Sequence, residues 1–98
     1  MTMIKGDDLK FPESRVLTIR TEDYFKIKGI DAHRYEPVGL HCVVSIRRTE
    51  RGLDKFLESM PADIEVVTDY KIFSIATVDL RMRIEFHYGT GLILKKEN

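Results

Sequence analysis

Two arginines and a histidine lie in one segment with a strand-like pattern and could together bind an anionic ligand. Arg81, Arg83 and His87 are spaced so that, in an extended chain, they project to the same face. Guanidinium groups bind carboxylates and phosphates through forked pairs of hydrogen bonds, and histidine readily exchanges a proton near neutral pH. These three residues are our first candidate ligand site. The competing interpretation is a solvated strand face whose charges pair with cross-strand neighbours such as Glu65.

A second candidate anion site lies at the start of a predicted helix. Arg48, Thr49 and Arg51 bring two cations and a hydroxyl to a helix end at which backbone N–H groups point outward. No glycine-rich phosphate-binding motif precedes them, because the sequence contains neither G-x-x-x-x-G-K-[ST] nor G-x-G-x-x-G. Ordinary helix capping by Thr49 with surrounding surface charge is the alternative interpretation.

Residue types that bind zinc are present, but their spacing does not predict a metal site. His41 and Cys42 are adjacent in a predicted strand and should point to opposite faces, so they cannot both reach one ion. The same geometry argues against a thiolate–imidazole catalytic pair. We therefore expect no metal, no cofactor and no catalytic residue. The residues considered were Asp31, His33, Glu36, His41, Cys42 and His87.

Composition narrows the classes of partner. The 98 residues include 16 basic and 16 acidic side chains, so no long-range field favours a polyanion or an anionic bilayer. A weak nucleic-acid interface would have to use Arg47, Arg48 and Arg51 with the lysines Lys26 and Lys28. A single cysteine and the lack of an apolar leader indicate a cytoplasmic protein with no membrane segment. The absence of glutamine and the 33% of charged residues are typical of thermophilic proteins.

The elements that must position these residues are mostly strands. From Leu80 to Tyr88 every second residue is apolar, which predicts a strand with Met82, Ile84 and Phe86 against a core. Arg81, Arg83, Glu85 and His87 should then face solvent. Leu53, Phe56, Leu57 and Met60 have the spacing of one buried helical stripe, which predicts a helix near residues 49–60. The other predicted strands are residues 15–20, 24–30, 40–47, 63–69, 70–78 and 92–94, with a loop over 31–39.

These elements predict a single α+β domain over residues 1–98, with a lead-in at 1–13 and a tail at 95–98. The sheet should be mainly antiparallel, with about six or seven short strands and one helix on one face. It is either open or curled into a partial barrel. Because several strands are apolar on both faces, one helix cannot cover them, and a second copy of the chain could.

The sequence thus favours a non-catalytic binding or assembly module that forms a homo-oligomer. One alternative is a small enzyme or anion-binding protein with a pocket around Arg81, Arg83 and His87. The other is the weak nucleic-acid binder described above. No feature of the sequence identifies a small-molecule ligand.

Overall fold

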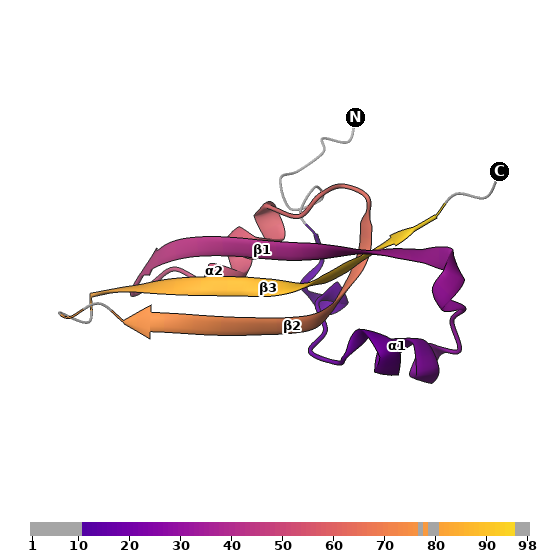
Figure 1. Ribbon diagram of the computed structural model, residues 1–98. Coiled ribbons are helices and arrows are strands. Elements are labelled where there is room, and N and C mark those ends of the chain that lie inside the picture. The colour runs from indigo at the N-terminus through magenta and orange to yellow at the C-terminus, as the bar shows by residue number, and fades with distance from the viewer. Residues whose placement is uncertain (1–10, 77, 79–80, 96–98) are drawn as a thin grey trace, which may run out of the picture.

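The protein is a long three-stranded sheet with one helix near an end of the sheet and another against the middle of its strands. Figure 1 shows it as a computed structural model that describes residues 11–76, 78 and 81–95. The predicted lead-in at 1–13 and tail at 95–98 lie mostly outside the described residues. The elements are α1 (Thr21–Lys28), β1 (Tyr35–Arg47), α2 (Gly52–Glu58), β2 (Ile64–Ala76) and β3 (Met82–Leu94), with short 3-10 turns at Glu13–Arg15 and Ala32–Arg34.

The sheet is open and antiparallel, and its strand order is β1-β3-β2. The predicted α+β class with an antiparallel sheet is therefore confirmed. The prediction of six or seven short strands, and of a partial barrel, is wrong. Within the described residues the sheet has three strands of 13 residues each. Two of the predicted breaks are absorbed inside single strands, and residues 15–20 and 24–30 form no strand.

The first absorbed break is a bulge in β2. Residues 63–69 and 70–78 were predicted as two strands, but Ile64–Ala76 forms one strand whose register shifts between Thr68 and Lys71. Asp69 adopts a left-handed conformation there, with φ of 56°, which aspartate tolerates better than most residues. The carboxylate of Asp69 accepts hydrogen bonds from the backbone N–H and the hydroxyl of Thr21. The backbone does therefore depart from regular strand geometry where the sequence predicts a break between strands. With Asp69 bonded to Thr21, the result is a bulge inside one strand and not a turn between two strands.

The second absorbed break lies in β3, where Gly89 and Gly91 continue the strand that begins at Met82. Neither glycine is needed for a bend, and both are needed for close packing. A Cβ at Gly89 would lie 2.9 Å from the side chain of Val67, and one at Gly91 would lie 2.6 Å from Ile64. The start of β2 therefore packs directly on the backbone of β3.

The strand predicted for residues 24–30 is wrong, because this segment lies in α1 and the turn that follows it. Acidic Glu22 and Asp23 lie in its first turn and Lys26 and Lys28 in its last, an order that favours a helix. Gly29 ends it with φ of 63°, the left-handed conformation typical of a helix C-terminus. The alternation of apolar and charged residues was too short to distinguish the two periods.

Two further boundaries differ from the sequence prediction. The predicted loop over 31–39 is half strand, because β1 begins at Tyr35 and Pro37 is tolerated on an edge strand. The predicted strand over 15–20 is reduced to a single parallel bridge, between Val16 and Val67, with backbone hydrogen bonds from the same segment to β2. The predicted helix near 49–60 is confirmed in a shorter form, Gly52–Glu58.

The core lies between α2, the first half of β2 and the second half of β3. Phe56, Ile64 and Val67 form its centre, and Leu40, Leu53, Met60 and Tyr70 are among the partly buried side chains around them. Phe56 and Leu57 of the predicted helical stripe are buried as expected. Figure 1 shows the far ends of the three strands extending beyond α2.

Candidate functional site

One face of the sheet carries large apolar side chains in cross-strand rows. In an antiparallel sheet, directly paired residues point to the same face. The register places Val43, Phe86 and Phe73 in one row. Ser45, Ile84 and Ile75 form the next row. We call this surface the uncovered face, and it also includes Met82 and Tyr88.

Several apolar side chains of the uncovered face are about half exposed. Val43 is 58% exposed, Phe73 55% and Ile75 48%, whereas large apolar side chains in the core are below 10%. These three residues line a shallow hollow of about 400 Å³ together with Phe86 and Tyr88. The rings of Phe73 and Phe86 are in tilted contact, with centroids 6.0 Å apart. The prediction that the apolar residues of β3 face the core is therefore wrong for this half of the strand.

The opposite face, which α2 covers, buries polar side chains of β3. Glu85 is 9% exposed and His87 only 1% exposed, although both were predicted to face solvent. Cys42 pairs with His87 and Val44 with Glu85, so their side chains share this face. The ring of Phe56, from α2, stacks on the imidazole of His87 with centroids 5.8 Å apart. α2 thus packs on the face of β3 that carries the polar side chains, and not on the face that carries the apolar ones.

Burial of these polar groups is possible because they bond to one another. His87 Nε2 lies 2.8 Å from Glu85 Oε1, and His87 Nδ1 lies 2.5 Å from the hydroxyl oxygen of Tyr70. A carboxylate only accepts hydrogen bonds, so Nε2 donates to Glu85 and, in a neutral ring, Nδ1 accepts from Tyr70. Burial, followed by the charge of Glu85, raises the pKa of Tyr70 to about 12, so the phenol keeps the proton that it donates.

Gly52, the first residue of α2, allows the helix to pack closely on the buried side chains of Glu85 and His87. A Cβ at this position would lie 2.0 Å from Glu85 Oε1 and 2.6 Å from His87 Nε2. The role of this glycine is steric, because it lets the helix backbone approach the buried carboxylate and imidazole.

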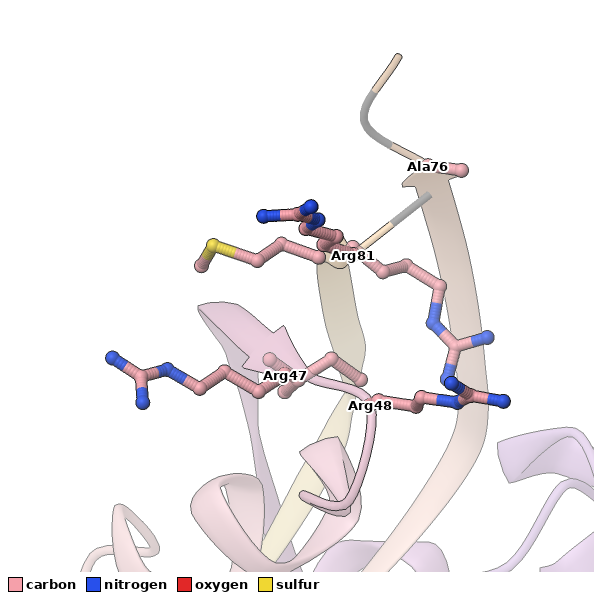
Figure 2. A pocket seen from close by; sticks show the side chains of 7 residues that line it. Arg47, Arg48, Ala76 and Arg81 are labelled. Carbon is pink, nitrogen blue, oxygen red and sulfur yellow. The ribbon is translucent and has the colours of Figure 1, made fainter. Parts of the chain in front are cut away.

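Four arginines line a second hollow at the far end of the sheet. Arg47 is the last residue of β1 and Arg48 follows it, whereas Arg81 precedes β3 and Arg83 is its second residue. The four surround a space of about 240 Å³. We call this the arginine hollow. Figure 2 shows Arg47 and Arg48 extending in opposite directions from neighbouring backbone positions. Arg47 pairs with Met82 in the register and so lies on the uncovered side, whereas Arg83 shares the covered face with Glu85.

The arginine hollow contains residues from both of the predicted anion sites. Arg81 and Arg83 lie together as predicted, and Arg48 of the second candidate site joins them. His87 does not, because it is buried beneath α2. Arg51 is also elsewhere, with its guanidinium 2.9 Å from Glu13 Oε1. Thr49 does not line the hollow, and α2 begins at Gly52 with Arg51 as a cap residue whose side chain makes no capping bond.

Cross-strand pairing does not neutralise Arg83. Its cross-strand neighbours are Ile46 and Ala76, and neither carries a charge. The pairing with Glu65 proposed as the alternative is wrong, because Glu65 lies at the opposite end of β2. Arg83 Nε instead lies 3.2 Å from Oε2 of Glu85, two residues along its own strand. This contact links the arginine hollow to the buried histidine.

The residues of metal-binding type are dispersed. His41 is exposed on the uncovered face and Cys42 is half-buried on the covered one, so the two point apart as the strand period predicts. The carboxylate of Asp31 accepts a hydrogen bond from the backbone N–H of His33. Among the residues that the structure describes, no three side chains of metal-binding type come together.

Sequence reasoning missed Tyr70 and the burial of Glu85. The i, i+2 spacing of Glu85 and His87 does place them on one face, but nothing in the strand itself shows that a helix will cover that face. Tyr70 could not be found from spacing, because the bulge at Asp69 sets the direction of its side chain.

Comparison of the chain with protein-family models, with curated proteins and with solved structures finds no match. In the part of the chain that the structure describes, no helix is long and apolar enough to cross a membrane.

Proposed function

We propose that this protein is a non-catalytic assembly module that self-associates by stacking the uncovered faces of two copies. The observation that carries the proposal is the set of half-exposed apolar side chains, Val43, Phe73, Ile75, Met82 and Tyr88, on one continuous face. Isolated surface hydrophobics are common, but contiguous patches of several hundred Å² mark interaction surfaces.

The size of the patch suits a second copy of the chain. Aromatic side chains bury roughly 150–250 Å² each, so the exposed parts of these side chains offer roughly 500 Å². Rim residues such as His41, Ser45 and Lys71 enlarge the contact. A stable interface buries about 800 Å² on each partner, so these side chains would supply more than half of it and the rim residues the remainder.

Geometry and charge are compatible with a symmetric contact. Two antiparallel sheets stack about 10 Å apart with their strands at about −30°, and a two-fold axis lets the same patch serve both partners. In this arrangement the Phe73–Phe86 pair of one copy packs against the corresponding rows of the other. The balance of 16 basic and 16 acidic residues means that net charge does not oppose association.

The burial of His87 supports the non-catalytic part of the proposal. With 1% of its surface exposed, the imidazole cannot contact a substrate without movement of α2. Tyr70 and Glu85 already satisfy both ring nitrogens.

Sedimentation velocity over a range of concentrations tests the proposal. We expect the wild type to sediment as a dimer at tens of micromolar, and Phe73→Ser to shift the dissociation constant upward at least tenfold. Ile27→Ser is the matched control, because Ile27 is a 71% exposed apolar residue on α1, away from this face. A wild type that remains monomeric throughout, or equal dissociation of the two variants, would show the proposal to be wrong.

A further inference from the structure

We infer that the arginine hollow binds a small anion carrying more than one phosphate group, with Arg48 and the arginines at the start of β3 as its donors. The hollow shares Met82 with the uncovered face, but its proposed donors Arg48 and Arg83 are not part of that face. It lies at the end of the sheet where β1 and β2 end and β3 begins (Figure 1).

Like charge gathers at the arginine hollow. Four arginines line one space of about 240 Å³, and each guanidinium is permanently charged. An anion bound between them lowers the repulsion between neighbouring cations. Within the described residues, Glu85 is the one carboxylate in ion-pair contact with Arg83, and it also accepts a hydrogen bond from His87. Arg48 has no ion pair in the same part of the chain.

The walls between the arginines are apolar. Among the described residues, Ile46, Ala76 and Met82 supply the remaining lining, and none of them is acidic. The small side chain of Ala76, opposite Arg83 in the register, leaves room beside the guanidinium. Apolar walls lower the local dielectric constant, which strengthens the attraction between the arginines and a bound anion.

The number and directions of the arginines indicate the size and charge of the ligand. Arg47 and Arg48 extend in opposite directions (Figure 2), so Arg48 can donate on the covered side while Arg47 contributes to the field from the other. A planar guanidinium donates two parallel hydrogen bonds to one phosphate group, and several arginines suit a diphosphate better than a single carboxylate. The zero net charge of the chain and the small volume argue against a long nucleic-acid strand.

Isothermal titration calorimetry with inorganic pyrophosphate tests the inference. We expect saturable binding by the wild type and at least tenfold weaker binding by Arg48→Ala and by Arg81→Ala. The matched control is Arg34→Ala, which removes the same charge from the exposed 3-10 turn before β1. This control should bind within twofold of the wild type. Arg48 is the main test because, unlike Arg83, it has no contact with the buried Glu85.

Three outcomes would overturn the inference. They are the absence of binding at millimolar pyrophosphate, equal weakening by Arg34→Ala and Arg48→Ala, or tighter binding of single-stranded RNA than of pyrophosphate. Orthophosphate and a nucleoside diphosphate, titrated in parallel, distinguish a requirement for the second phosphate from recognition of a nucleoside. Phe73→Ser should retain pyrophosphate binding, so failure of the self-association proposal would leave this test unaffected.

Discussion

The two faces of the same sheet differ in a way that reverses the usual relation between polarity and burial. On the covered face, His87 and Glu85 are buried under α2, whereas on the uncovered face Phe73 and Val43 are more than half exposed. The strands that carry them are the same. The difference lies in what packs above, because α2 lies over one face and places its glycine at the point where the polar groups need room.

The comparison shows that an alternating strand specifies two faces without specifying which is inside. A buried polar cluster is tolerated when each member has a partner, as Tyr70, His87 and Glu85 do. The apolar face is then left for another contact. Substitutions matched across the sheet should therefore have very different effects.

The largest effect is expected from removal of the buried histidine. His87→Ala leaves a cavity, a carboxylate without its N–H donor and an unpaired Tyr70 hydroxyl, so the free energy of unfolding should fall by about 3–5 kcal/mol. His41→Ala, an exposed histidine on the other face, should change it by less than about 0.5 kcal/mol. Urea denaturation followed by circular dichroism measures both, and equal losses would contradict the assignment of the faces.

A pair of isoleucines gives the next comparison. Ile46 is 1% exposed on the covered face and Ile75 is 48% exposed on the uncovered one. We expect Ile46→Ala to destabilise the monomer by about 2–4 kcal/mol, and Ile75→Ala by less than about 1 kcal/mol. The measurement should be made at the lowest practical concentration, where self-association does not add to stability. A larger loss for Ile75 under those conditions would mean that the face is covered within one chain.

The smallest effect concerns pH. Folding raises the pKa of Tyr70 from 10.0 to about 12, so below pH 10 both states hold the proton and the tyrosine adds no pH dependence. Between pH 10 and pH 12 the unfolded chain releases the proton while the folded chain retains it, so the free energy of unfolding falls as pH rises. The slope is at most about 1.4 kcal/mol per pH unit, and the partial exposure of Tyr70 lowers it. Tyr70→Phe should remove this extra slope, and an unchanged slope would contradict the mechanism.

Local periodicity predicted the α+β class, the antiparallel pairing and the helix around Phe56 and Leu57. It failed where a distant contact decides the outcome. The bulge at Asp69 depends on Thr21, which lies 48 residues away in the sequence. Four alternating residues near Phe25 could not be distinguished from a helix turn, and only the charges at its ends favour the helix.

The candidate sites show the same limit. Arg81 and Arg83 could be paired from spacing alone because they share a strand face. Their approach to Arg48 depends on the antiparallel register of β1 and β3, which no local pattern gives. His87 does not join these arginines, because α2 buries it, and the pattern of its own strand does not show that a helix covers that face.

The contact of β2 with the glycines of β3 has an evolutionary consequence. At Gly89 and Gly91 the space for any side chain is already filled by Val67 and Ile64, so even a methyl group would displace a core residue. Selection should remove substitutions at these two positions and tolerate them over much of the end of the sheet that lies away from the glycines. Divergent versions of this chain would then keep two glycines separated by one residue while the rest of the strand changes.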